Sequence, residues 1–75
     1  MAATVLHLIK NGDTRLARAV IDQNLGAGDR VTVALLPGAA APALPAGVAV
    51  HRVPDDFSYE RLLELIFEAD QVIAW

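Results

Sequence analysis

The chain contains no cysteine, so its 75 residues can form neither a disulfide nor a thiolate nucleophile. This absence excludes cysteine-based catalysis, and it predicts a cytoplasmic protein, because small secreted domains usually depend on disulfides. Basic charge is also scarce: six Lys and Arg against nine Asp and Glu give a net charge of -3. Direct nucleic-acid binding is therefore not expected, since it requires a basic surface.

Long apolar runs are missing as well. None approaches the roughly 20 residues that span a bilayer, and the first residues lack the basic segment of a signal peptide, so no membrane association is expected. Hydrophobic residues nevertheless make up 55% of the sequence, which is enough for one dense core. The chain is expected to form a single domain over residues 1–75.

Near-continuous apolar runs alternate with segments of helical spacing. The runs predict strands at residues 4–9, 30–36, 48–53 and 71–75. One helix is expected from Asp13 to Gly26 or Gly28, and a second is expected to begin at Asp56 or Ser58. The apolar stripe of the first helix is predicted to be Leu16, Ala17, Val20, Ile21 and Leu25. The apolar face of the second is predicted to be Tyr59, Leu62, Leu63, Ile66 and Phe67.

This order of elements predicts an α/β fold, a small flavodoxin-like open parallel four-stranded sheet in the order 2-1-3-4 with one helix on each face. Residues 37–47 hold three prolines and no charge, so they are expected to form a loop where a helix would otherwise cover the first two strands. A loop covers less area than a helix, so an exposed apolar patch and oligomerisation are expected. The interface residues predicted are Pro37, Ala41 and Leu44 in this loop and Trp75, which is expected either to close the small core or to anchor an interface.

Ligands in open α/β sheets bind beyond the carboxyl ends of the strands. The residues expected at that rim are Lys10, Asn11, Gly12, Asp13, Thr14, Gly38, Asp55 and Asp56. Free amides at the start of the first helix, with the charge of Lys10, suit an anion such as a nucleotide phosphate. Alternatively, Gly12 only forms a turn and Asp13 only caps the helix, because the stretch matches no phosphate-binding motif.

The remaining polar residues point to structural roles. Asp55 and Asp56 could bind a divalent cation or accept a phosphoryl group, but turn and cap chemistry explains them without a metal. His7 lies inside an apolar run, and neither it nor His51 has a neighbouring Ser, Cys or second His for a triad or a zinc site. No catalytic residue, metal or cofactor is therefore predicted.

Three stretches carry a family resemblance: "TVLHLIKNGDTRLARAV", "GDRVTVALLPGA" and the closing "QVIAW". Together they resemble the DsrE/DsrF/DsrH superfamily, which includes the TusB, TusC and TusD sulfur-relay subunits, and most closely the DsrH/TusB branch. The resemblance implies a flavodoxin-like fold, homo- or hetero-oligomers of related small α/β subunits, and a place in sulfur relay or tRNA thiolation. Carriers in this family hold a persulfide on a cysteine, so a chain without cysteine cannot take that role.

Three functions remain open from the sequence. The favoured one is a non-catalytic, DsrE/DsrH-like oligomeric subunit or interaction module. The alternative is a small anion- or nucleotide-binding domain that uses residues 10–14 after the first strand. The third is an enzyme with His7 or Asp55 as acid or base, which requires a buried, perturbed group in a pocket.

Overall fold

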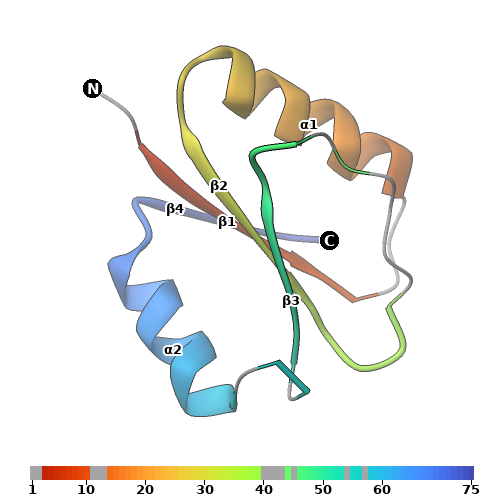
Figure 1. Ribbon diagram of the computed structural model, residues 1–75, viewed down its shortest axis with the longest axis vertical. Helices are drawn as coiled ribbons and strands as arrows, with labels where there is room; N and C mark the ends of the chain where they lie inside the picture. Colours follow the sequence, from red (N-terminus) through yellow and green to blue (C-terminus); the bar gives the residue numbers. More distant parts are fainter. Residues whose placement is uncertain (1–2, 11–13, 40–43, 45, 54, 57) are drawn as a thin grey trace.

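The computed structural model describes residues 3–10, 14–39, 44, 46–53, 55–56 and 58–75. The chain alternates strands and helices as the sequence predicts (Figure 1). The elements are β1 (Thr4–Ile9), α1 (Thr14–Gly26), β2 (Arg30–Leu35), β3 (Ala49–Arg52), α2 (Tyr59–Glu68) and β4 (Gln71–Ala74). Neither described helix is both long enough and apolar enough to cross a membrane.

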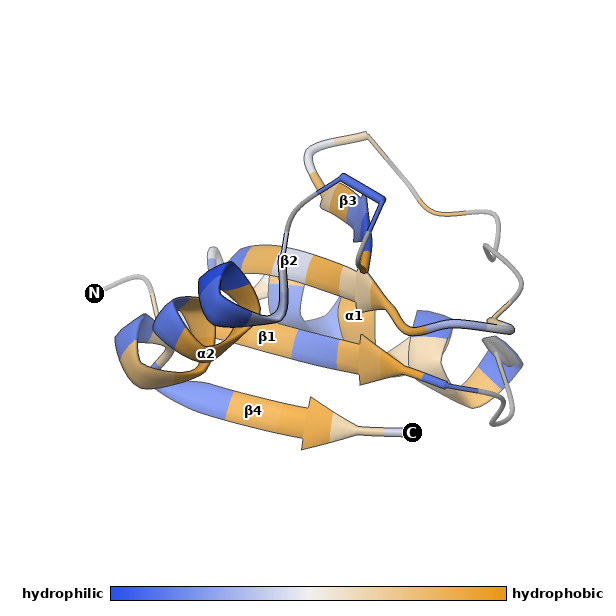
Figure 2. Cartoon of the chain, turned by 90° about the horizontal axis from the view of Figure 1, so that it is seen from below, coloured by the Kyte–Doolittle hydropathy of each residue, from blue (hydrophilic) through white to orange (hydrophobic). Residues whose placement is uncertain are grey.

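All strand pairs of the four-stranded sheet are parallel, as expected. The predicted strand order, 2-1-3-4, is wrong: the observed order is β3-β2-β1-β4. The predicted order would place β3, with His51 and Arg52, in the centre of the sheet. Central strands of a parallel sheet are buried on both faces, so they must be apolar on both. β1 and β2 are buried over most of their length and are largely apolar, with one hydrophilic band inside β1 (Figure 2). The shorter β3 and β4 are largely exposed and lie at the edges.

The two helices cover opposite faces of the sheet, which confirms the expected placement (Figure 1). On one face, Ala17 and Ile21 of α1 pack against a buried cluster from β1 and β2. That face also receives three side chains from the segment between β2 and β3, namely Ala39, Leu44 and Val48. On the other face, Leu62 of α2 packs with Leu6, Ala34 and Val53.

Local sequence fixes where the helices stop and start. At the end of α1, Gly28 has a φ of 82°, the Gly28 N–H donates to the Leu25 carbonyl and the Asp29 N–H to the Asn24 carbonyl. This is a Schellman motif, which glycine favours because it adopts positive φ without strain. At the start of α2, the Ser58 hydroxyl accepts a hydrogen bond from the Arg61 N–H at 3.3 Å. Ser58, one of the two expected residues, is therefore the N-cap.

The loop after β2 is described only in part, because residues 40–43 and 45 lie outside the described residues. Its described residues add a buried Ala39 and a half-buried Leu44 to the α1 face of the sheet, and an exposed apolar patch at this loop stays a prediction. The predicted apolar stripes are only partly buried, because Leu16 on α1 and three residues on α2 remain exposed. Those three are Tyr59, Leu63 and Phe67. On the other face, the described element that covers the sheet is α2, a ten-residue helix whose Leu62 packs with Leu6 of β1, Ala34 of β2 and Val53.

Candidate functional site

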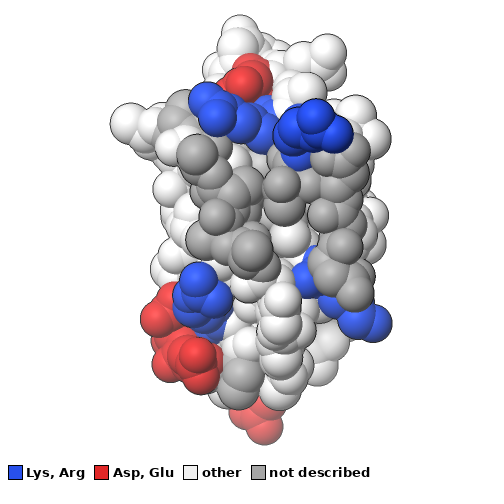
Figure 3. Space-filling model, turned by 90° about the vertical axis from the view of Figure 1, so that its right-hand side faces the viewer, with Lys and Arg blue, Asp and Glu red and all other residues white. Residues whose placement is uncertain are grey.

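The strand order places the switch point of the sheet between β1 and β4, because the chain leaves β1 in one direction and reaches β4 from the other. Two described residues lie at the carboxyl ends of these two strands: Lys10 follows β1, and Trp75 follows β4. Lys10 is exposed to solvent. The described basic side chains on this side of the molecule lie in separate groups and form no continuous stripe (Figure 3).

The backbone of Trp75 continues the pairing of β4 with β1, and its indole ring lies against His7. The Trp75 backbone N–H donates to the Leu8 carbonyl at 2.9 Å, and its indole Nε1–H donates to Nδ1 of His7 at 3.0 Å. The two rings are stacked, with centroids 6.2 Å apart and planes inclined by 10°. Trp75 also packs against the α1-side cluster. The indole is therefore part of the interior on this face of the sheet.

His7 is fully buried, and both of its ring nitrogens have partners. Because an indole N–H can only donate, Nδ1 of His7 must be the acceptor in the bond with Trp75. In the neutral ring the other nitrogen then carries the proton, so Nε2–H donates to Oδ1 of Asn24 on α1, 2.9 Å away. Both ring nitrogens of His7, the one buried polar side chain found among the described residues, therefore have a hydrogen-bond partner. This arrangement gives His7 the structural role predicted from its apolar neighbours.

The predicted anion loop is described only at its two ends. Lys10 closes β1 and Thr14 begins α1, while Asn11, Gly12 and Asp13 lie outside the described residues. The expected cap at Asp13 and turn at Gly12 therefore stay predictions, and so does anion binding by this loop. The described first turn of α1 contains no acidic residue.

The acidic pair is not next to that loop. Asp55 and Asp56 follow β3, and β2 separates β3 from β1. Two strand spacings are about 10 Å, so Asp55 and Asp56 do not converge with Lys10 as the predicted order would have made them. Asp56 serves its own turn: its Oδ2 accepts from the Arg52 N–H at 2.7 Å, and its N–H donates to the Arg52 carbonyl. This is the turn chemistry expected for the pair.

The other predicted positions have mixed surroundings. Gly38, with a φ of 88°, and Pro37 form an exposed turn after β2. Leu44 and Trp75, predicted at an interface, are half-buried against the α1-side cluster of the same chain. Ala41 lies outside the described residues. Among the described residues we find neither a pocket nor a group of three potential metal ligands.

Comparison of the chain with protein-family models, with curated proteins and with solved structures gives no match. The geometry of the described residues is thus the basis for a functional proposal.

The most prominent surface feature is one that sequence reasoning assigned to the core. Tyr59, Leu63 and Phe67 follow one another at intervals of four residues, so they form a stripe along α2, which we call the α2 flank. Their exposed fractions are 53%, 55% and 86%. A signal was present in the sequence: six of the ten residues of α2 are large and apolar, which is more than one helix face can bury against a small sheet.

Proposed function

We propose that this chain is a non-catalytic interaction module that assembles with other subunits through the α2 flank. The observation that carries the proposal is the exposure of three large apolar side chains in one stripe, with Phe67 almost completely in solvent. Contiguous apolar surface of this kind usually marks an interaction site.

The chemistry of the candidate acid–base residues supports a structural role. Both nitrogens of His7 are committed to hydrogen bonds inside the protein, so the ring has no free lone pair to accept a proton from a substrate. Asp55, the other candidate, is exposed in the turn after β3, and no pocket is found among the described residues. His7 helps to hold the fold together in the geometry observed.

The resemblance to the DsrE/DsrF/DsrH superfamily suggests a biological setting for this module. In that setting the chain is a cytoplasmic subunit that supports sulfur relay or tRNA thiolation next to a related subunit that carries the cysteine. A chain without cysteine can help to build such an assembly but cannot hold the persulfide itself.

Native mass spectrometry of the tagged full chain, purified gently from cells, tests the assembly role. We expect the wild-type chain to be found in a complex larger than the monomer, and Leu63→Glu to disrupt it, because a charge in an apolar interface loses its hydration. Leu16→Glu is the matched control, since Leu16 on α1 is also 55% exposed. A wild-type chain that is monomeric and free of other subunits would contradict the proposal.

A further inference from the structure

We propose that the occupant of the α2 flank is a second copy of this chain, joined to the first by antiparallel pairing of the two β4 strands. This inference rests on the proposed function and names its partner. It predicts a two-fold symmetric dimer in which the two sheets become one continuous sheet of eight strands.

The two edges of the sheet differ in how far they are protected. At the β3 edge, the Val53 N–H bonds inward to Leu35, so the N–H of Arg52 points outward, where the Asp56 carboxylate accepts it at 2.7 Å. A charged residue and an occupied donor are typical of a protected edge strand. The β3 edge is therefore a poor site for adding a strand.

The β4 edge has no comparable protection among the residues that the structure describes. Its four residues, Gln71–Ala74, are uncharged, and their strand pairs with β1 on one side. The Trp75 N–H bonds inward to Leu8, so the alternation of a parallel ladder directs the peptide groups of Val72 and Ala74 outward. These groups can form a ladder with another strand.

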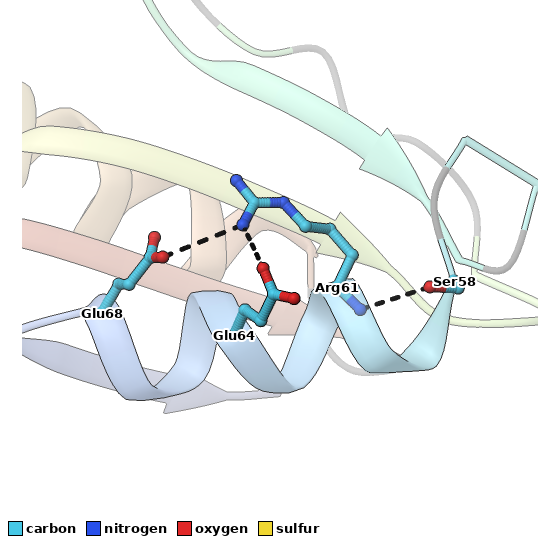
Figure 4. Close-up of polar contacts among 4 residues, drawn as sticks. All are labelled: Ser58, Arg61, Glu64 and Glu68. Atoms are coloured by element: carbon cyan, nitrogen blue, oxygen red, sulfur yellow. Dashed lines mark hydrogen bonds and ion pairs between the residues drawn. The ribbon is translucent and has the colours of Figure 1, made fainter.

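The α2 flank lies on the β4 side of its helix. Leu62, Ile66 and Ala69 face the sheet, and Figure 4 shows Arg61 reaching from α2 toward the side of β2 and β3. Arg61 bonds there to Glu64 at 2.8 Å and lies 3.8 Å from Glu68. Helical geometry puts Tyr59, Leu63 and Phe67 on the opposite side, which faces β4 in a right-handed crossover.

The flank continues onto the edge strand. Val72 is in register with Leu6, and Ala74 with Leu8, so both side chains lie on the α2 face of the sheet. Both residues are exposed. One apolar surface therefore extends from Phe67 and Leu63 on the helix to the free edge of β4.

A second copy fits this surface by symmetry. Antiparallel pairing of β4 with β4 places a two-fold axis perpendicular to the sheet, which keeps both α2 helices on the same face. The two α2 flanks then face each other above the joined strands. Neither the flank nor β4 carries a charged side chain, so the surface meets its own copy without like-charge repulsion.

The area is compatible with a modest dimer. The exposed parts of Tyr59, Leu63, Phe67 and Val72 come to on the order of 400 Å² per chain, from typical side-chain areas. Two copies bury roughly twice that area before the β4 backbone is included, close to the lower limit of about 1,000 Å² for a specific interface. We therefore expect a reversible dimer that dissociates on dilution.

Sedimentation equilibrium of the purified full chain over a concentration series tests the inference. We expect a monomer–dimer equilibrium in the wild type and in Leu16→Glu, and at least a tenfold weaker dimer in Leu63→Glu. Ala74→Pro removes one outward N–H and should also weaken the dimer, because proline blocks strand addition. Circular dichroism verifies that each variant is folded.

Amide hydrogen exchange gives an independent readout on the wild type. The N–H groups of Val72 and Ala74 should become protected as the concentration rises through the dimer range, while that of Arg52 should not change. A dimer in which these two amides exchange freely, or which Leu16→Glu weakens and Leu63→Glu does not, would overturn the β4 interface. A wild type that stays monomeric at millimolar concentration would overturn the second copy as occupant.

The failure of this inference is distinguishable from that of the proposed function. If the pure chain is monomeric but the complex from cells contains another subunit and is lost in Leu63→Glu, the partner is a different protein and the assembly role stands. If neither preparation contains an assembly, both proposals are wrong.

Discussion

At the scale of single residues, the most informative group is the buried contact between His7, Asn24 and Trp75. It joins the central strand, the first helix and the last strand through two hydrogen bonds and one ring stack. A buried polar group that is fully hydrogen-bonded costs little, but it becomes expensive once a partner is lost. This contact therefore specifies how α1 and β4 dock on β1.

Replacing Asn24 with Ala tests that role. The change leaves the buried Nε2–H of His7 without an acceptor, so we expect a loss of about 1–3 kcal/mol in the free energy of unfolding, measured in urea. The adjacent Gln23→Ala, at an exposed position on the same helix, is the control and should change stability by less than about 0.5 kcal/mol. Nitrogen-15 shifts of the wild-type ring should also show the proton on Nε2; a proton on Nδ1 would contradict the assignment.

At the scale of elements, short sequence motifs determine where the helices begin and end. The two glycines at the end of α1 separate two effects, the entropy cost of glycine in a helix and its freedom to adopt a positive φ. Gly26 is the last helical residue and has no positive φ, whereas Gly28 is left-handed at 82°. A Cβ at either position meets no atom within 4 Å, so backbone conformation is the difference between them.

Alanine at the two positions should therefore act in opposite directions. Gly26→Ala should stabilise the protein by about 0.5–1 kcal/mol, because alanine loses less backbone entropy in a helix. Gly28→Ala should destabilise it by about 1–2 kcal/mol, because an L residue is strained in the left-handed region. Thermal unfolding of the two variants beside the wild type measures both changes, and equal shifts would show that the Schellman motif does not end α1 in solution.

At the scale of the whole molecule, the strand order determines which residues lie close together at the surface. With β2 between β1 and β3, the acidic turn after β3 is separated from the lysine after β1, and the predicted ligand rim is divided. The same order leaves β4 as an edge beside the α2 flank. The arrangement thus favours an interaction surface over a convergent polar site.

Introduced cysteine pairs distinguish the observed order from the expected one, since the chain has no cysteine of its own. Thr32→Cys with Ala49→Cys should form a disulfide on mild oxidation, because these residues are paired between β2 and β3. Leu8→Cys with His51→Cys should not, because β2 lies between their strands and disulfides need Cα atoms within about 7 Å. Mass spectrometry of the oxidised proteins reads the result, and the reverse pattern would restore the order 2-1-3-4.

The sequence by itself determined the elements and the class of fold. Apolar runs and helical spacing located four strands and two helices, and alternation of strands with helices predicted a parallel sheet. The sequence narrowed two helix ends to Gly26 or Gly28 and to Asp56 or Ser58, and the structure selects Gly28 and Ser58. These features depend on residues close together in the chain, where side-chain pattern and backbone preference act directly. The interior role of His7 also followed from its neighbours in β1.

Only the tertiary structure decided which strands are neighbours and which apolar residues remain in solvent. Helical spacing assigned Tyr59, Leu63 and Phe67 to the core, yet the sheet beneath α2 accommodates only Leu62 and its partners on the sheet-facing side. Burial depends on the area that other elements offer, which periodicity along one helix does not contain. For the same reason the bond between His7 and Trp75, 68 residues apart, has no signature in the sequence.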